Sequence, residues 1–182
     1  MTWQILGNFG VGIPVMNSTV DQQSFSNHDG FGVPMHLAFA GFHPNETSGQ
    51  LHWGYSMDAM LFSKTYWSYL GSDSAEIGQV LLGGSVLYYL NDRRTMFLRS
   101  SLGFSGITYE HETNFYGDRR IENRSEYSNG YGFLVEIGDS FKTELFAEML
   151  TYSLTLAGAS AFSKSGVNAD LGYISANIGI LW

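Results

Sequence analysis

The sequence predicts an all-β fold in which eight antiparallel strands run up and down and close into a barrel. Three observations lead to this prediction. Apolar residues alternate with small or polar residues in eight separate segments, and a period of two is typical of strands with one apolar face. Long polar connectors and short turns join the segments alternately. Charged residues make up only 14% of the chain, well below the content of about 25% that is typical of soluble domains.

Composition sets the size of the fold and excludes several classes of partner. The chain has 182 residues, which suggests a single domain over residues 1–182. Its hydrophobic content of 44% excludes a disordered chain. The net charge of −8, without a basic cluster, argues against nucleic acid as a partner. Because the chain has no cysteine, it has neither disulfides nor thiolate metal sites, and we expect no metal and no cofactor.

The first four strands are expected near residues 3–15, 31–40, 51–61 and 79–90. In each segment the large apolar residues take every second position, and mostly small or polar residues fill the row between them. Alternate positions of a strand lie on one face of the sheet, so each strand has an apolar face and a small-residue face. The apolar rows are Trp3, Ile5, Phe9, Val11, Ile13 and Val15; Phe31, Val33, Met35, Leu37 and Phe39; Leu51, Trp53, Tyr55, Met57 and Leu61; and Val80, Leu82, Val86, Tyr88 and Leu90.

The last four strands are expected near residues 96–105, 131–138, 144–155 and 173–182. In the third of these the alternation loses its phase between Thr151 and Leu154, which indicates a β-bulge. The other three alternate as cleanly as the first four. The apolar rows are Met96, Leu98, Leu102 and Phe104; Tyr131, Phe133, Val135 and Ile137; Leu145, Ala147 and Met149; and Ile174, Ala176, Ile178, Ile180 and Trp182.

The connectors alternate in length along the chain. Long polar connectors are expected at residues 17–30, 64–76, 110–129 and 157–166, and short turns at residues 43–50, 91–95 and 139–143. In an up-and-down barrel this alternation places the long loops at one end and the short turns at the other.

The composition of the small-residue face distinguishes between two kinds of barrel. No stretch of the sequence is long and apolar enough for a membrane-spanning helix. A lipocalin-like soluble barrel turns its apolar face inward, whereas an outer-membrane barrel turns it outward to lipid. Here the second face is mostly Gly, Ser, Ala, Asn and Gln, which suits the crowded lumen of eight strands better than a surface in water. The sequence therefore predicts an eight-stranded antiparallel up-and-down transmembrane β-barrel, with a soluble ligand-binding barrel as a further alternative.

The last strand resembles that of a known class of proteins. Ile174, Ala176, Ile178, Ile180 and Trp182 form an alternating apolar row that ends in an aromatic residue. This row resembles the C-terminal assembly signal of Gram-negative outer-membrane proteins, which the barrel-assembly machinery reads. The whole chain resembles the class of the OmpA transmembrane domain, OmpX and NspA. The resemblance implies a monomer in the bacterial outer membrane, in contact with lipid and lipopolysaccharide, with extracellular long loops and periplasmic short turns.

Aromatic residues support this placement, because Trp and Tyr favour the two membrane–water interfaces. Those expected near the long loops are Tyr66, Trp67, Tyr69, Tyr109, Tyr127 and Tyr131, and those expected near the short turns are Trp3, Trp53, Tyr88, Phe146 and Trp182.

Few charged residues fall within the strands, and those that do fall on the small-residue face. An arginine between two carboxylates makes charge-assisted hydrogen bonds in an interior poor in water. A structural plug is the first interpretation of such a group, and a gate or proton-linked path through the barrel is the second. The residues expected to form this lumen network are His36, His52, Asp58, Arg99, Glu136 and Glu148.

No grouping of residues predicts an enzyme. His52, Ser56 and Asp58 share one strand face, but neighbours on that face are roughly 7 Å apart, too far for the hydrogen bonds of a hydrolytic triad. The face that they share also points away from lipid. We therefore expect no catalytic residues, and an outer-membrane enzyme that modifies the acyl chains of lipid A is the alternative.

The third long connector is the most distinctive surface element. Its alternating charged and aromatic residues can extend a hairpin above the membrane and present an edge or a tip to partners, and arginine pairs well with lipopolysaccharide phosphates. A solvated loop without a partner is the alternative. We expect a non-enzymatic protein that acts through extracellular loops in adhesion, binding of an extracellular protein partner, or envelope integrity. The surface-binding residues are Arg119, Arg120, Arg124, Tyr116 and Tyr127.

Overall fold

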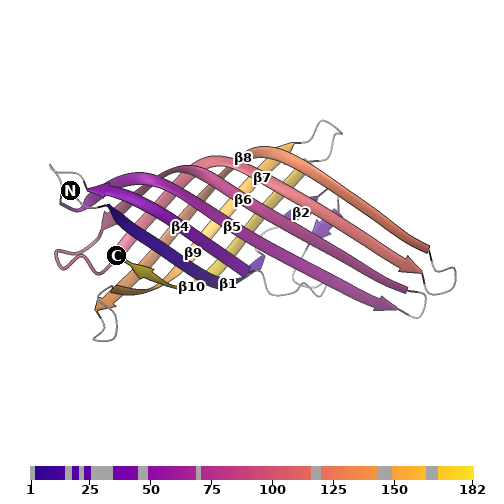
Figure 1. Ribbon diagram of the computed structural model, residues 1–182, viewed down its shortest axis with the longest axis horizontal. Helices are drawn as coiled ribbons and strands as arrows, with labels where there is room; N and C mark the ends of the chain where they lie inside the picture. Colours follow the sequence, from indigo (N-terminus) through magenta and orange to yellow (C-terminus); the bar gives the residue numbers. More distant parts are fainter. Residues whose placement is uncertain are drawn as a thin grey trace.

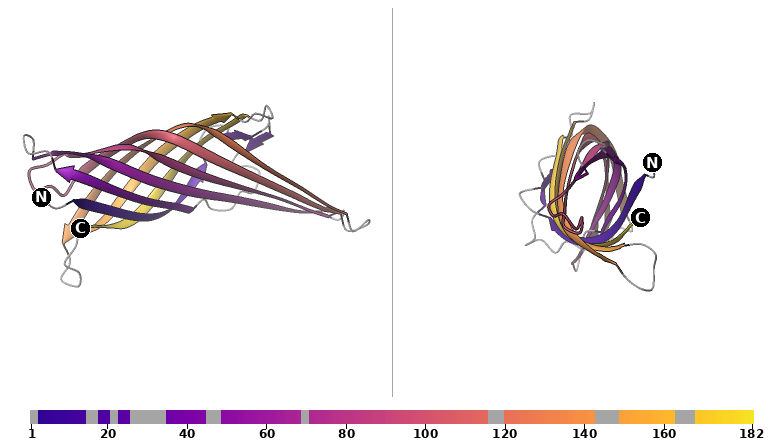
Figure 2. Two further views of the ribbon diagram at one scale, coloured as in Figure 1. Left: turned by 45° about the horizontal axis from the view of Figure 1, so that its top comes forward. Right: turned by 90° about the vertical axis from the view of Figure 1, so that its left-hand side faces the viewer.

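The computed structural model describes residues 3–14, 18–20, 23–25, 35–44, 49–68, 71–115, 120–142, 149–162 and 168–182. Over these residues the chain forms one antiparallel sheet, and eight of its strands close into a barrel (Figure 1). Viewed along its long axis, the sheet forms an oval ring (Figure 2). The predicted fold class is confirmed. The barrel strands are β1 (Gln4–Pro14), β4 (Met35–Pro44), β5 (Leu51–Ser68), β6 (Gly71–Tyr89), β7 (Phe97–Phe115), β8 (Arg120–Lys142), β9 (Met149–Phe162) and β10 (Asn168–Leu181).

The sheet closes through its first and last strands. β1 pairs with β10 from Leu6↔Leu181 to Pro14↔Tyr173. Backbone hydrogen bonds of 2.7 and 3.0 Å also join Ile5 and Trp182 in both directions. The other neighbours in the ring follow the order of the chain, as expected for an up-and-down barrel. In the described part of the chain, no helix has the length and hydropathy needed to cross a membrane.

Two further strands lie within the first predicted long connector. β2 (Ser18–Val20) and β3 (Gln23–Phe25) form a short hairpin. β2 pairs with Ala169 and Asp170 of β10, beyond the point where β10 stops pairing with β1. Part of this connector therefore adds to the wall of the sheet.

Several strands extend far beyond their predicted ends at the long-loop side. Residues 64–76 and 110–129 are predicted to be connectors, but β5 and β6 are strands through most of the first range, and β7 and β8 through most of the second. β9 likewise runs to Phe162, through part of the predicted 157–166 connector. The prediction of long loops here is wrong. The strands of these two hairpins remain paired in antiparallel register although their polar residues form no apolar face. The expectation that the third connector extends its hairpin is correct.

Both termini and the short turns lie at the opposite end of the barrel (Figure 1). In the turn between β6 and β7, the side-chain oxygen of Asn91 accepts hydrogen bonds from the backbone N–H groups of Thr95 and Met96, at 2.9 and 3.2 Å. This turn lies where the sequence predicts it. The prediction of a turn at 139–143 is wrong for residues 139–142, because β8 continues to Lys142. Residues 143–148 lie outside the described residues.

In the seventh predicted strand, the residues that face inward are not those that the alternation predicts. β9 pairs without interruption with both β8 and β10, so the predicted bulge between Thr151 and Leu154 is absent. Thr151 and Ser153 are buried in the lumen, and Met149 packs against lumen residues instead of facing outward. Hydroxyl residues on the inner face therefore explain the blurred alternation in this segment.

The apolar rows face outward. Leu102, Phe104, Tyr131 and Ile178 are each 70–71% exposed. This outward apolar surface contradicts the soluble lipocalin-like alternative, whose apolar face would point inward.

The aromatic residues mostly follow their prediction. Trp3, Trp53, Tyr88 and Trp182 are exposed near the short-turn end, and Tyr127 and Tyr131 are exposed towards the other end. The prediction for Tyr109 is wrong, because its ring is only 4% exposed and packs inside the barrel. Tyr69 and Phe146, and the side chains of Tyr66 and Trp67, lie outside the described residues.

The lumen is filled in layers. One apolar cluster lies near the short turns, and a larger one lies towards the long-loop end, so the lumen contains large side chains as well as the small ones that the sequence predicts. Along β7, Phe97 belongs to the first cluster and Ile107 to the second, and buried Arg99 lies between them. The first cluster is Leu6, Ala40, Phe42, Leu87, Tyr89, Phe97 and Leu181, and the second is Met60, Phe62, Ile77, Leu81, Ile107, Tyr109, Leu134, Ala157, Ala159, Ala161, Ala169, Leu171 and Tyr173.

Glycine allows two strands of the wall to approach closely. Gly83 of β6 and Gly103 of β7 are directly opposite each other. A Cβ atom at Gly103 would lie 2.0 Å from the carbonyl oxygen of Leu82, and one at Gly83 would lie 2.1 Å from that of Leu102. A side chain at either position would push the two backbones apart. At Gly84, by contrast, a Cβ atom would meet nothing within 4 Å.

We therefore expect Gly103→Ala to destabilise the barrel and Gly84→Ala to leave it unchanged. Overpacking of this kind costs about 1–3 kcal/mol, whereas a surface change stays within about 0.5 kcal/mol. The measurement is the free energy of unfolding in urea, followed by tryptophan fluorescence in detergent micelles. Equal unfolding midpoints for the two variants would contradict the close approach of β6 and β7.

Candidate functional site

A buried arginine lies at the centre of the polar layer of the lumen. Arg99 of β7 is fully buried, and its Nε donates to Oε2 of Glu136 at 2.6 Å. Its Nη2 donates to Oδ1 of Asp58 at 2.7 Å. Glu136 is the direct cross-strand partner of Arg99, whereas Asp58 belongs to β5, two strands away. The guanidinium thus joins three strands through two charge-assisted hydrogen bonds.

The second carboxylate oxygen of Glu136 also has donors. Oε1 accepts hydrogen bonds from Nδ2 of Asn8, on β1, and from Oγ of Ser153, on β9. Thr151 donates to the amide oxygen of Asn8 at 3.2 Å. Both oxygens of this buried carboxylate are therefore satisfied, as a charge in a water-poor interior requires.

An amide side chain continues the network to His36. Asn177 of β10 donates from Nδ2 to Oγ1 of Thr155 and Oγ of Ser153, at 2.9 and 3.2 Å. Its Oδ1 lies 2.9 Å from Nδ1 of His36, on β4. Nε2 of His36 lies 3.6 Å from Oδ1 of Asp58.

These contacts form a closed ring around the lumen. Starting from Arg99, it passes through Glu136, Ser153, Asn177, His36 and Asp58 and returns to Arg99. Its six members come from β7, β8, β9, β10, β4 and β5, and Asn8 attaches β1. The ring therefore fixes seven of the eight barrel strands relative to one another at one level of the lumen.

Four of the six predicted lumen residues come together in this ring. They are His36, Asp58, Arg99 and Glu136. His52 is also buried in the lumen, but its ring packs edge-on against Tyr89, with centroids 5.4 Å apart, within the apolar layer near the short turns. Glu148 lies outside the described residues.

The sequence prediction missed two members of the ring, Ser153 and Asn177, and Asn8, which is attached to it. Asn8 and Asn177 are polar residues on the small-residue face of their strands, and that pattern could have marked them as partners of the buried charges. Ser153 lies where the alternation loses its phase, so the pattern does not mark it. The roles of all three residues depend on the relative heights of strands that are far apart in the sequence.

The arrangement does not assemble a hydrolytic triad from His52, Ser56 and Asp58. Ser56 donates to Oγ of Ser101 at 3.0 Å, and Asp58 is bound by Arg99. In the described part of the chain, no group of three histidine or acidic residues is placed to hold a metal ion. With apolar layers on both sides, the ring has the features of a structural plug.

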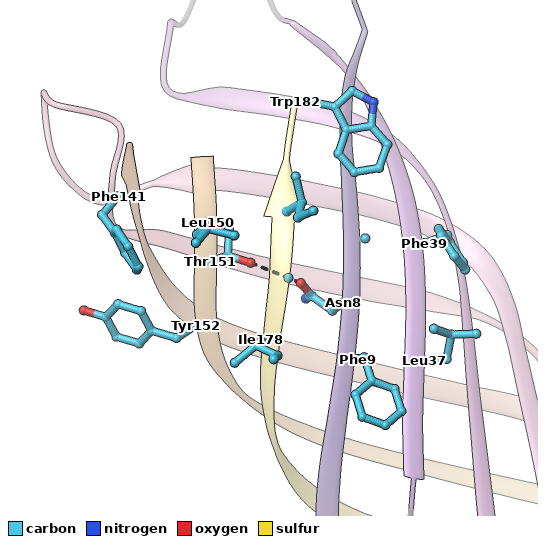
Figure 3. Close-up of a pocket in the computed structure, with 13 residues that line it drawn as sticks. Asn8, Phe9, Leu37, Phe39, Phe141, Leu150, Thr151, Tyr152, Ile178 and Trp182 are labelled. Carbon is cyan, nitrogen blue, oxygen red and sulfur yellow. Dashed lines mark hydrogen bonds between the residues drawn. The ribbon is translucent and has the colours of Figure 1, made fainter. Parts of the chain in front are cut away.

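The predicted assembly-signal residues line the outer face of β10. Ile174, Ile178 and Trp182 are 38%, 70% and 49% exposed, and Ala176 and Ile180 lie on the same face. Ile178, Ile180 and Trp182 border an apolar hollow of about 640 Å³ where β10 meets β1 (Figure 3). The hollow deepens at Gly7, which has no side chain to fill the space between Phe39 and Trp182. It faces outward and has apolar walls, so in a bilayer it would contact hydrocarbon.

The strands β5 to β8 project beyond the rest of the barrel and converge on a narrow tip (Figure 2). Pairing between β4 and β5 ends at Met35↔Leu61, and pairing between β8 and β9 ends at Asn129↔Phe162. We call residues 62–68, 71–77, 107–115 and 120–128 the projecting sheet. Its outer face carries exposed Glu76, Glu110 and Glu112.

Three of the five predicted surface-binding residues, Arg120, Arg124 and Tyr127, belong to strand β8 of this projecting sheet. Tyr127 is 58% exposed on β8. Arg120 and Arg124 occupy strand positions of β8, and the structure describes only their backbone. Tyr116 and Arg119 lie outside the described residues.

Known structures share this architecture. The crystal structure of Ail, the attachment invasion locus protein of Yersinia pestis, matches with a TM-score of 0.57 over 100% of both chains, at 15% sequence identity. Ail in complex with the heparin analogue sucrose octasulfate gives a TM-score of 0.56 at 13% identity, again over 100% of both chains. The outer membrane protein OprG from Pseudomonas aeruginosa gives 0.50 at 11% identity, over 99% of this chain and 95% of OprG.

This is the fold of the small eight-stranded outer-membrane β-barrels. The resemblance noted from the sequence is confirmed for the fold. No protein-family model matches the chain, and neither does any curated protein sequence.

We expect removal of the central charge to destabilise the barrel strongly. Arg99→Met leaves Asp58 and Glu136 buried without a counter-charge, and breaking a buried ion pair in this way costs about 3–5 kcal/mol. Arg93→Met makes the same chemical change at an exposed turn position and serves as the control. Urea unfolding in micelles measures both variants. A loss below about 1 kcal/mol for Arg99→Met would show that the ring does not stabilise the fold.

Proposed function

We propose that the protein is an integral protein of the bacterial outer membrane, without enzymatic activity, that acts through the part of its sheet outside the membrane. The observation that carries this proposal is that the distribution of apolar and charged side chains in the barrel is the inverse of that in a soluble protein. Large apolar residues cover the outer face of a closed sheet, and the ion-paired residues Asp58, Arg99 and Glu136 are buried inside it. A closed sheet pairs all of its backbone polar groups, which is what a lipid environment requires.

The distribution of aromatic residues supports an orientation. Exposed Trp3, Trp53 and Trp182 lie at the short-turn end, where they would mark one membrane interface. The short turns are then periplasmic, and the projecting sheet and long loops are extracellular. In this orientation Ile174, Ala176, Ile178, Ile180 and Trp182 form the outward row of β10 that the barrel-assembly machinery would read during insertion.

The packing of the lumen favours a role for the outside of the protein. Among the described residues a polar ring lies between two layers of buried apolar side chains, so a gate or proton-linked path is less well supported than a structural plug. The lipid A-modifying alternative is also less well supported, because Ser56 and Asp58 are engaged inside the lumen and His52 packs against Tyr89 there. Adhesion, binding of an extracellular partner and envelope integrity are the roles that remain for the projecting sheet.

Basic residues at the tip suggest an anionic ligand. Arg119, Arg120 and Arg124 would suit the phosphates of lipopolysaccharide or the sulfates of a host polysaccharide, since arginine pairs well with both kinds of oxyanion. The structure of Ail with a heparin analogue lends support to this choice of chemistry. Tyr116 and Tyr127 would complete this surface, with Tyr127 on the face of β8 opposite to the positions of Arg120 and Arg124.

The first expected outcome concerns membrane insertion. Protein folded in detergent and run on SDS-PAGE without boiling should migrate differently from boiled protein, because a closed sheet has no edge for the detergent to attack. It should also remain with the lipid when reconstituted into liposomes. A monodisperse protein in detergent-free buffer, with no heat shift, would contradict the membrane proposal. A change in the mass of lipid A on expression in a Gram-negative host would contradict the non-enzymatic proposal.

The second expected outcome concerns the anionic ligand. We expect reconstituted protein to bind immobilised heparin, and Arg120→Gln/Arg124→Gln to bind it at least about tenfold more weakly, because a hydrogen bond to a charged group contributes about 1.5–3 kcal/mol. Arg93→Gln, at the opposite end of the barrel, is the matched control. If both variants bind like the unsubstituted protein, these arginines are not the anion site.

A further inference from the structure

One edge of the projecting sheet has no paired neighbour among the described residues. Within the described residues, the segment 120–128 of β8 pairs with β7 alone, because β9 begins to pair with β8 only at Asn129. An open edge presents a row of unpaired backbone donors and acceptors, which is a template for another strand. The segment is continuous strand over its whole length.

The charges along this edge are self-complementary. Arg120, Glu122, Arg124 and Glu126 occupy alternate positions of β8 and therefore one face of the sheet. If the segment pairs antiparallel with a second copy of itself about Asn123, Arg120 is opposite Glu126 and Glu122 is opposite Arg124. The same two pairs recur on the other side of the axis, so four pairs of opposite charge form in one row. Opposite charges at directly paired positions stabilise an antiparallel sheet.

Neighbouring registers are unfavourable. A shift of the axis by one residue in one direction places Glu122 opposite itself and Arg120 opposite Arg124. A shift in the other direction places Arg124 opposite itself and Glu122 opposite Glu126. Like charges at directly paired positions are destabilising, so these two registers are disfavoured. A shift of the axis by two residues, to residue 121 or 125, brings opposite charges together again but forms two such pairs among these four residues instead of four, so the pattern favours the register about Asn123. If the axis moves by half a residue, the charged row of the partner strand lies on the opposite face of the sheet from the charged row of the first strand, so the two rows do not pair.

We propose that residues 120–126 of β8 pair antiparallel with the same residues of a second copy of this chain, about a twofold axis at Asn123. The inference rests on the proposed function, because it requires the projecting sheet to lie outside the membrane. β8 runs from the tip towards the barrel in every copy. Two antiparallel β8 edges therefore belong to copies in facing membranes, and the pairing is a contact between two cells or vesicles. The expectation of a monomer within one membrane is compatible with it.

The contact is short, so its strength depends on the number of copies. Seven paired residues span roughly 23 Å, at about 3.4 Å per residue. A single contact of this size is weak and reversible. Many copies on two facing surfaces act together, because each pair formed holds the next pair at high effective concentration.

A single cysteine tests the register. The chain has no cysteine, so an introduced thiol has no internal partner. In the proposed register Asn123 is opposite Asn123 of the second copy, and directly paired Cβ atoms are about 4.5–5.5 Å apart, within reach of a disulfide. Ser125 is opposite Ile121, so two copies of residue 125 are about 14 Å apart. Ser125→Cys is therefore the matched control.

The experiment uses the full chain in lipid nanodiscs that hold one barrel each, so that a disulfide can form only between discs. Under mild oxidation we expect Asn123→Cys to give a two-barrel species on non-reducing SDS-PAGE, and Ser125→Cys to give less than a tenth as much. No two-barrel species from Asn123→Cys, or equal amounts from both variants, would overturn the proposal.

Charge exchange tests the pairing without a covalent bond. Arg120→Glu/Arg124→Glu makes the whole row acidic, and Glu122→Arg/Glu126→Arg makes it basic. Liposomes that carry the unsubstituted protein should cluster, as measured by turbidity, and those that carry either double variant alone should not. A mixture of the two variants should cluster again, because every pair then has opposite charges. Clustering of each variant alone, or failure of the mixture, would overturn the proposal.

These outcomes separate the inference from the proposed function. If the barrel inserts and shows its heat shift but copies neither cross-link nor cluster, self-pairing is wrong and the membrane proposal stands. If the chain does not insert, the proposed function itself is wrong.

Discussion

The structure depends on the buried charge of Arg99. A guanidinium in an interior poor in water needs counter-charges, and Glu136 and Asp58 supply them from two different strands. The remaining oxygen of Glu136 in turn needs donors, which Asn8 and Ser153 provide, and Asn177 joins Ser153 to His36. Each polar group of the ring thus requires a partner side chain from another strand at the same level of the lumen. The pairing of β1 with β10 closes the sheet through its backbone, and the side-chain ring closes a second circuit of contacts inside the lumen.

Such a ring braces the barrel from inside. Apolar clusters lie on both sides of the ring, and Gly83 and Gly103 allow β6 and β7 to approach closely. An eight-stranded barrel is just wide enough for side chains to fill, so polar groups in its interior must bond to one another. Under the proposed function, chemistry that involves a partner therefore belongs to the projecting sheet.

The sequence predicts the parts of this structure that depend on alternation alone. Eight apolar rows determine the strands, and the scarcity of charge on the other face determines which side is outside. Arg99 and Glu136 could be predicted as lumen residues, because both break a small-residue row. The closed ring could not be predicted, because it depends on the tilt and stagger of eight strands, and so on the levels of Asn8 and Asn177 relative to His36. Tyr109 shows the same limit, since its position along β7 indicates a membrane interface but its phase places it inside.

The predicted loops 64–76 and 110–129 differ from the structure for a separate reason. Inside a membrane, a strand needs an apolar face, so polarity there indicates a loop. Beyond the membrane both faces of a strand meet water, and a polar segment can remain a strand if its neighbour is in register. An unpaired edge of such a sheet is a template for another strand. In the pairing that we propose, the alternating charges of β8 restrict the choice of partner, because a partner strand must carry the complementary sequence of charges. The proposed contact would therefore make a general liability of sheet edges selective.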